Sequence, residues 1–318
     1  MSIETVEASV KHCYSTWSKD YYHDYYTQAA AYPPIHRELI RKLLQEHACA
    51  NVLDAGCGPA SMLRDLVDVV PQLYGFDLTP EMVAEAKKVM ADLGTPSHQI
   101  WEGSVLDPQA FLPPIGENDQ AHDQPQLIRQ QGGFDSAICV GVLPHVPAES
   151  DIVVMQNLAS AVKPGGLVVA EARNQLFSLF TLNRYSAGLF ASDLIDFDQL
   201  KTEYPEHAEQ LDATKSELSE RFRMDLPPIR EGKEDEPGYD EVLSRTHNPF
   251  EMIEVAKQAG LEDVELQFYH YHALPPMFEK AMPQLFRQAS LKLEQPHDWR
   301  GHFMASAFLV CGRRPLAR

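Results

Sequence analysis

Two glycines and two aspartates form the most informative chemical pattern in the sequence. A short apolar run ends in Asp54-Ala55 and leads into Gly56-Cys57-Gly58, and Asp77 follows Gly58 by 19 residues. Glycine has no Cβ, so the backbone at such a turn can approach a ligand closely. A carboxylate at this distance along the chain can accept hydrogen bonds from both hydroxyls of a ribose. The pattern therefore predicts a nucleoside-binding site.

A third glycine is missing from this pattern. Ser61 occupies the position that completes G-x-G-x-x-G in sites that bind the pyrophosphate of a nicotinamide cofactor. The spacing therefore favours a nucleoside without a diphosphate. A nicotinamide-dependent oxidoreductase on a Rossmann-like core remains an alternative.

Strands and helices that would position these residues can be recognised in the sequence. Between residues 51 and 172, β-branched apolar runs alternate with helical patterns, which is typical of βαβ units. The predicted strands span residues 52–55, 73–76, 99–102, 136–140 and 167–172, followed by 264–271 and 305–312. We expect an α/β fold with a doubly wound, mostly parallel sheet of seven strands.

Three other segments surround this core. We expect residues 1–45 to form a helical N-terminal cover and residues 176–245 to form an inserted lid with many acidic residues. The core then comprises residues 46–175 and 246–318. Residues 112–133 are rich in Pro, Gln, Gly and Asp and predict a surface insertion.

The motifs resemble those of the class I S-adenosylmethionine-dependent methyltransferases. The similarity covers most of residues 50–175 and, less specifically, 246–312. The segments that carry it are Leu53-Asp54-Ala55-Gly56-Cys57-Gly58, Gly75-Phe76-Asp77, Gly103-Ser104-Val105-Leu106-Asp107, residues 134–140 and residues 158–166, which end in Lys163-Pro164-Gly165-Gly166.

The resemblance implies a Rossmann-like methyltransferase fold that binds S-adenosyl-L-methionine and releases S-adenosyl-L-homocysteine. It places Gly56 and Gly58 against the methionine part, Asp77 on the ribose, and Leu78 or Met82 beside the adenine. The full set implied to bind the cofactor is Asp54, Gly56, Cys57, Gly58, Asp77, Leu78, Met82, Ser104, Val105 and Val140. Ser104 departs from the family, which often has an aspartate there to accept from the adenine amino group.

Histidines follow several of the later predicted strands. Ligands of a doubly wound sheet collect at the carboxyl ends of its strands, so these histidines are candidates for contact with the methyl acceptor. A histidine that titrates near neutral pH can remove the proton of a hydroxyl. His145 is the first candidate base, followed by His270 and His272 and then His302. No His or Cys spacing typical of a metal site occurs, so we expect no metal.

Cationic and aromatic residues are candidates for binding the acceptor. Arg173 and Asn174, with Arg245 and Arg184, could clamp an anionic group, because arginine matches carboxylate geometry. Tyr21 with Tyr25, or Tyr22 with Tyr26, could line one face of a helix that closes the pocket. Each of these residues also has a structural explanation, as surface pairing or helix packing.

The composition limits the class of partner. The 318 residues include 27 Lys and Arg against 46 Asp and Glu, a net charge of −19, which disfavours nucleic acid and anionic membranes. There is no signal-peptide pattern or apolar run long enough for a membrane span, and the five cysteines are scattered, so we expect a cytoplasmic protein. The oligomeric state, monomer or homodimer, stays open.

Together these features predict methyl transfer to an O or N atom of a small, anionic metabolite. Two alternatives are a protein or RNA methyltransferase and a nucleoside-binding module without catalysis.

Overall fold

The computed structural model of the chain describes residues 2–17, 21–26, 33–114, 128, 130–229, 231–232 and 238–316. It divides into two compact units. The first comprises Met1–Arg173, Glu231–Gln267 and Phe308–Arg318, and the second comprises Asn174–Arg230 and Phe268–Ala307. Most of the predicted insertion at 112–133 lies outside the described residues.

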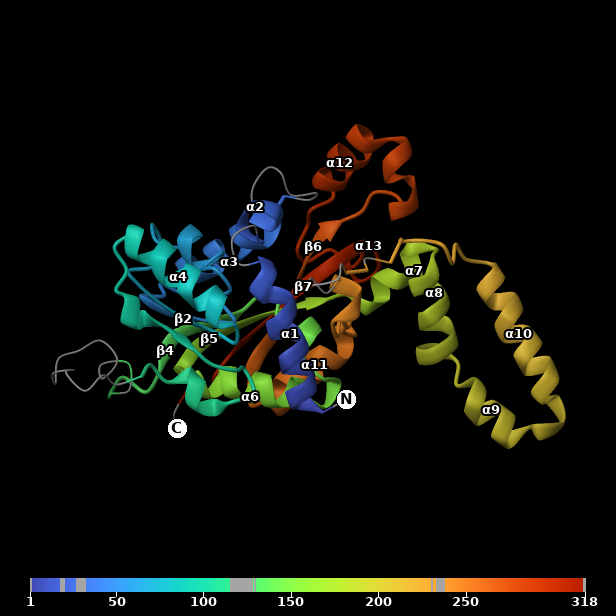
Figure 1. The fold of residues 1–318 in the computed structure, drawn as a ribbon, viewed down its shortest axis with the longest axis horizontal. Helices are drawn as coiled ribbons and strands as arrows, with labels where there is room; N and C mark the ends of the chain where they lie inside the picture. The colour runs from blue at the N-terminus through green and yellow to red at the C-terminus, as the bar shows by residue number, and fades with distance from the viewer. Residues whose placement is uncertain are drawn as a thin grey trace. The chain divides into compact units, whose positions relative to one another are not determined.

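A seven-stranded sheet forms the centre of the fold (Figure 1), with strand order β3-β2-β1-β4-β5-β7-β6. Four pairings are parallel, namely β1 with β2 and β4, β2 with β3, and β4 with β5. Strand β7 runs antiparallel to β5, because Gly165 N–H donates to Arg314 near one end and Asn174 N–H donates to Ser306 near the other. The strands are β1 (Asn51–Ala55), β2 (Gln72–Asp77), β3 (Ile100–Glu102), β4 (Phe134–Cys139), β5 (Val162–Arg173), β6 (Glu262–Tyr271) and β7 (Ala305–Arg313). The predicted fold class is confirmed.

Burial explains why these runs become strands. All five residues of β1 are buried, as expected for a strand that lies between two parallel neighbours and is covered on both faces. Strand β5 begins five residues before the prediction, at Val162. The Lys163-Pro164-Gly165-Gly166 segment joins the strand because Arg314 exchanges backbone hydrogen bonds with Gly165 and Gly166.

Helices of the first unit flank this sheet. Three of them fall in the predicted N-terminal cover: α1 (Ile3–Trp17), α2 (Tyr21–Tyr26) and α3 (Ile35–Glu46). The others are α4 (Pro80–Asp92), α6 (Asp151–Ala161) and α11 (Pro249–Gln258). Asn248 caps α11 by accepting from Phe250 N–H. Thr79 precedes α4 without a side-chain cap.

The second unit differs in its boundaries from the predicted lid. It includes residues 268–307, which the prediction assigned to the core, and it excludes residues 231–245. The side-chain amide of Asn174 donates to the carbonyls of Gly301, His302 and Ala305, and this ties the start of the insertion to the chain before β7. The helices of this unit are α7 (Ser178–Thr181), α8 (Arg184–Gly188), a π-helix (Leu189–Leu194), α9 (Phe197–Glu203), α10 (Ala208–Glu220), α12 (Pro283–Lys292) and α13 (Gly301–Met304).

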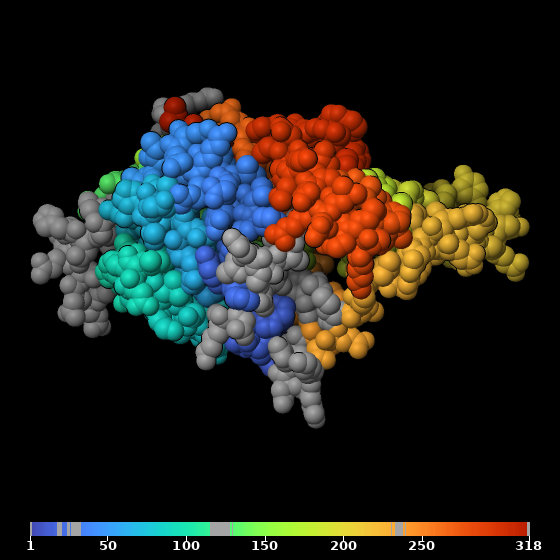
Figure 2. Space-filling view, turned by 90° about the horizontal axis from the view of Figure 1, so that it is seen from above, coloured from blue at the N-terminus to red at the C-terminus, as the bar shows by residue number. Residues whose placement is uncertain are grey.

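Two helices of this unit, α9 and α10, are joined by an ion pair between Lys201 and Asp212. They are largely exposed (yellow in Figure 2), and α10 buries none of its side chains. Among the described residues, no helix has the length and apolar character that crossing a bilayer would require.

Candidate active site

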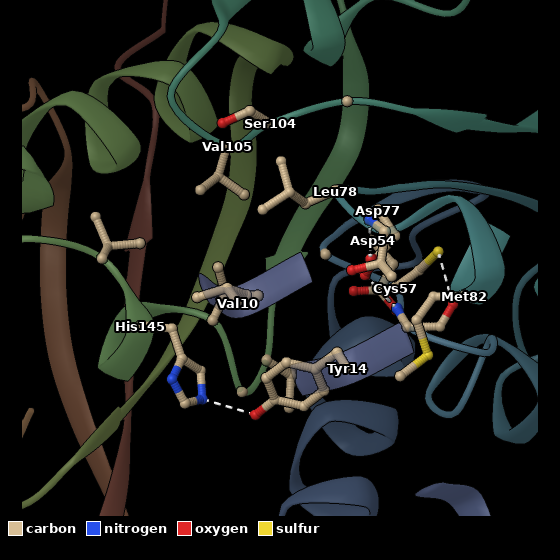
Figure 3. Close-up of a pocket in the computed structure, with 18 of the residues that line it drawn as sticks. Val10, Tyr14, Asp54, Cys57, Asp77, Leu78, Met82, Ser104, Val105 and His145 are labelled. Atoms are coloured by element: carbon tan, nitrogen blue, oxygen red, sulfur yellow. Dashed lines mark hydrogen bonds between the residues drawn. The ribbon is translucent and has the colours of Figure 1, made fainter. Parts of the chain in front are cut away.

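One pocket of the first unit lies at the carboxyl ends of β1, β2, β3 and β4, with α1 on its open side (Figure 3). Its empty space, including open solvent at the mouth, is about 920 Å³. All ten residues expected to bind the cofactor are among those that line it, as are Tyr21 and His145. The pocket is therefore the site to which the sequence motifs point.

The loop after β1 brings backbone close to the pocket. Gly56 and Gly58 have φ of 86° and 52°, in the left-handed region that favours glycine. The N–H groups of Gly56 and Cys57 both donate to the carbonyl of Phe76. A Cβ added to Gly56 would lie 2.3 Å from Cγ2 of Val142, so only glycine fits this turn.

Asp77 ends β2 and is held in one orientation. One carboxylate oxygen accepts from Gly58 N–H at 2.8 Å, and the other accepts from Thr79 N–H at 2.8 Å. Burial raises the pKa of Asp77, and these hydrogen bonds oppose that rise. Asp77 lines the pocket, and a carboxylate is the acceptor that a ribose diol needs.

Asp54 is 2% exposed, and its environment is costly for a charge. Burial, followed by the charge of Asp77, raises the pKa of Asp54 to about 8. Its Oδ1 has no hydrogen-bond partner among the described residues. Because buried polar atoms are normally satisfied, the residues present fit a ligand that brings a cationic or hydrogen-bond-donating group to Asp54.

Apolar side chains form the walls of the pocket. Leu78, Met82, Val105 and Val140 line it from three different strand ends and from α4 (Figure 3). Burial raises the pKa of the Cys57 thiol well above its usual value, so this thiol is neutral. Such walls fit the flat faces of a purine.

Ser104 is joined to a residue that the sequence did not single out. Its hydroxyl donates to the carboxylate of Glu7 on α1 and accepts from Leu106 N–H at 3.1 Å. Glu7 itself lines the pocket.

His145 lies in the short helix Leu143–His145 and is joined to Tyr14 of α1 (Figure 3). Its Nδ1 is 2.7 Å from the carbonyl of Leu243, which can only accept, so the Nδ1 carries the proton. Its Nε2 is 2.8 Å from the Tyr14 hydroxyl and therefore accepts from it. Burial, followed by the charge of Arg173, lowers the pKa of His145 to about 4. The imidazole is neutral, with its Nε2 lone pair directed at Tyr14.

Tyr14 and Glu7 were missed in the sequence, although a signal was present. Glu7, Val10 and Tyr14 are spaced by three and four residues and share one face of α1, and all three line the pocket. Helical periodicity could have found the face, but the loops it covers are distant in the chain.

One of the two expected tyrosine pairs of α2, Tyr22 with Tyr26, has its rings in contact. Tyr21 and Tyr26 line the pocket, with ring centroids 6.5 Å apart. Tyr22 stacks on Tyr26, while Arg64 lies 3.8 Å from the Tyr22 ring centroid. The side chain of Tyr25 lies outside the described part of the structure.

The residues proposed to clamp an anion each have partners within the protein. Arg245 forms an ion pair with Asp151 and donates to the carbonyl of Val146 at 2.6 Å, and Arg173 donates to the hydroxyl of Ser244. The side-chain amide of Asn174 donates to three backbone carbonyls, and the residue is 2% exposed. Arg184 lies over the ring of Tyr185 in the second unit. No arginine or lysine occurs among the described residues that line the pocket.

His270, His272 and His302 belong to the second unit, whereas the described residues that line the pocket belong to the first. His272 is buried against Phe177 and Phe286, at 4.6 and 5.7 Å between ring centroids, and burial lowers its pKa to about 4. His302 is near Phe268, at 4.5 Å. These contacts account for His272 and His302 as packing residues. A catalytic role for His270 and His272 stays an untested prediction. No group of three or more His, Cys, Asp or Glu side chains within the described ranges is placed to hold a metal ion.

Comparison with known proteins supplies the family. Residues 24–213, more than half of the chain, match the family described as "Methyltransferase domain". The chain belongs to the methyltransferase family. The predicted class I family is thus confirmed, and with it S-adenosylmethionine as the cofactor.

Relatives of this methyltransferase include two named "Ubiquinone biosynthesis O-methyltransferase". The one from Xanthomonas euvesicatoria is 30% identical over 149 residues, 47% of this chain and 53% of the relative. The one from Burkholderia multivorans is 29% identical over 125 residues, 39% of this chain and 45% of the relative. The chain thus spans about half the length of the curated relatives it matches.

Solved methyltransferase structures are more distant. The magnesium protoporphyrin IX methyltransferase from Synechocystis with bound SAM is 11% identical, with a TM-score of 0.46 over 97% of each chain. A SAM-dependent methyltransferase from Archaeoglobus fulgidus is also 11% identical, with a TM-score of 0.42 over 87% of this chain and 94% of that one.

Proposed function

We propose that this methyltransferase transfers a methyl group from S-adenosylmethionine to a hydroxyl oxygen of a small molecule. The observation that carries the proposal is the Tyr14–His145 hydrogen bond in the same pocket as the glycine loop and Asp77. A nucleoside cradle and a neutral, oriented imidazole are the two parts that such a reaction needs.

Three features of the pocket support binding of the cofactor. Asp77 would accept from the ribose hydroxyls, since its oxygens are already oriented by Gly58 and Thr79. Asp54 would accept from the α-ammonium, which would satisfy its unpartnered Oδ1. Gly56 and Gly58 line the pocket, where the methionine part would lie against them. When bound, the cofactor supplies an electrophilic methyl group on a sulfonium.

The protein's own residues would handle the proton of the acceptor. As the acceptor oxygen attacks the methyl carbon, its proton would pass to the Tyr14 hydroxyl while the Tyr14 proton passes to Nε2 of His145. The carbonyl of Leu243 holds the Nδ1 proton, so the imidazole can accept only at Nε2. The resulting imidazolium is disfavoured by burial and would return its proton to water once product leaves. The pair thus supplies a route for the proton from the acceptor to Nε2 of His145.

Oxygen is favoured over nitrogen as the acceptor atom for two reasons. A neutral amine needs no base, whereas a hydroxyl does, and the pocket contains one. The relatives at 29–30% identity carry "O-methyltransferase" in their names. The described lining includes no arginine or lysine, and the anionic character of the acceptor stays an untested prediction.

A small molecule is favoured over a macromolecule. The net charge of −19 opposes a nucleic-acid partner. We place the protein in the cytoplasm as part of this proposal.

The test is a screen for release of S-adenosylhomocysteine with phenols, catechols, aliphatic alcohols, amines and carboxylic acids. We expect turnover with a hydroxyl compound, and we expect His145→Ala to lower kcat while leaving the affinity for S-adenosylhomocysteine within about twofold. Turnover confined to amines or carboxylic acids, with full activity in His145→Ala, would overturn the proposal.

A further inference from the structure

Three carboxylates line the pocket among its described residues: Asp54, Asp77 and Glu7. Asp54 and Asp77 are assigned above to the ammonium and the ribose. Glu7 has no role in that scheme, although α1 brings its carboxylate to the site.

The bound cofactor presents three separate groups that donate hydrogen bonds: the α-ammonium, the ribose diol and the exocyclic amine of adenine. A carboxylate can only accept, so each of these groups matches a carboxylate. With Asp54 assigned to the ammonium and Asp77 to the ribose, the adenine amine is the donor group that remains for Glu7.

The positions of the three carboxylates agree with this assignment. Asp54 lies in β1 and Asp77 ends β2, while Ser104, which holds Glu7, comes two residues after β3. These strands are neighbours in the order β3-β2-β1, about 4.8 Å apart. The Gly103 amide donates to the Asp77 carbonyl at 2.9 Å, so the loop with Ser104 starts beside Asp77. An extended ligand with its ribose at Asp77 would have its ammonium on the β1 side and its base on the β3 side.

Ser104 orients the Glu7 carboxylate, and Glu7 is the residue that would contact the ligand. The Ser104 hydroxyl donates its hydrogen to Glu7 and accepts a hydrogen bond from Leu106 N–H. Glu7 accepts from Ser104 through Oε1. Its other oxygen can accept from a ligand without breaking that bond.

We infer that Glu7, supplied by the N-terminal helix and oriented by Ser104, recognises the exocyclic amine of adenine. This inference rests on the proposed function, because it presumes that the adenosyl cofactor occupies the pocket. The inference makes α1 part of the cofactor site. It also gives a residue outside the sheet the role of distinguishing adenine from other nucleobases.

The experiment compares binding of S-adenosylhomocysteine with S-inosylhomocysteine, in which a carbonyl replaces the amine. Wild-type protein should bind the adenosyl ligand at least about tenfold more tightly, because the carbonyl would face the Glu7 carboxylate. Glu7→Gln offers an amide that can donate to the carbonyl, so the preference should shrink by about tenfold or invert. Glu4→Gln, an exposed position on the same helix, should leave the preference unchanged.

The ratio of the two affinities separates recognition from structure. The amide oxygen introduced by Glu7→Gln can still accept from Ser104, so a purely structural role would lower both affinities equally or not at all. An unchanged ratio in this variant would therefore overturn the inference. If wild-type protein bound neither ligand, the proposed function would fail as well, and that outcome is visible before any variant is made.

Discussion

Nε2 of His145 lies 2.8 Å from the hydroxyl oxygen of Tyr14, although the two residues are 131 positions apart in the chain. The Leu243 carbonyl fixes the proton on the other ring nitrogen. This relationship combines a neutral base and a phenol in a pocket that also holds the glycine loop, and the first two predictions below depend on it.

Removing the base should slow the chemical step. We expect His145→Ala to lower kcat by about 10²- to 10⁴-fold on a hydroxyl acceptor, which is the usual contribution of general-base catalysis. Tyr14→Phe should also lower kcat, because the phenyl ring cannot pass on a proton. Steady-state kinetics at saturating cofactor measures both effects. His98→Ala, at an exposed position outside the pocket, is the matched control.

The acid limb of kcat should lie unusually low. Burial lowers the pKa of His145 to about 4, so the imidazole stays neutral and able to accept a proton throughout the range from about pH 5 to 7. A pH profile of kcat at saturating cofactor should therefore be flat down to about pH 5. A fall centred near pH 6.5, roughly the usual histidine value, would show that the base is a more exposed group.

Binding of S-adenosylhomocysteine should release a proton at neutral pH. The pKa of Asp54 is raised to about 8, so the free protein holds this carboxyl protonated below that pH, whereas the ammonium of the ligand stabilises the anion. Affinity should rise with pH until about 8 and then level off. Calorimetry in buffers of different ionisation enthalpy measures the released proton, and Asp54→Asn should bind more weakly and release none from this site.

Gly56→Ala should cost more than a positive φ alone. A Cβ at Gly56 would meet Cγ2 of Val142 at 2.3 Å, whereas a Cβ at Gly94, with nearly the same φ, would meet nothing within 4 Å. We expect Gly94→Ala to lower the free energy of unfolding by about 1 kcal/mol and Gly56→Ala by clearly more, with loss of cofactor binding. Urea unfolding of both variants provides the comparison. Equal losses would mean that Val142 simply moves aside.

The sheet and the glycine loop could be predicted because their signals are local. Each strand appears as a short apolar run, and Gly56, Gly58 and Asp77 are joined by two adjacent strands, so spacing alone places them together. The residues supplied by α1 could not be placed in this way. Their partners, Ser104 and His145, lie 97 and 131 residues further on, and no local pattern encodes such a pairing.

The roles of charged and polar side chains were the hardest to predict from the sequence. In the sequence, Arg245 is equally compatible with binding a substrate anion and with pairing with a buried carboxylate. Only its ion pair with Asp151 in the structure decides between these two roles. Asn174 likewise resembles a ligand-binding amide in sequence, while in the structure it satisfies backbone carbonyls. A polar side chain at the end of a strand is therefore ambiguous until its neighbours are known.

Helix α1 is the first element of the chain, yet its hydrogen bonds to Ser104 and His145 reach residues 97 and 131 positions away. Contacts of such long range form late, since the intervening chain must first be ordered. Helix α1 can thus dock only after the segments around Ser104 and His145 are ordered, and the sheet can assemble around an uncovered crevice. A polypeptide that lacks α1 should still fold its sheet, but its pocket would lack the Glu7 carboxylate and the Tyr14 hydroxyl.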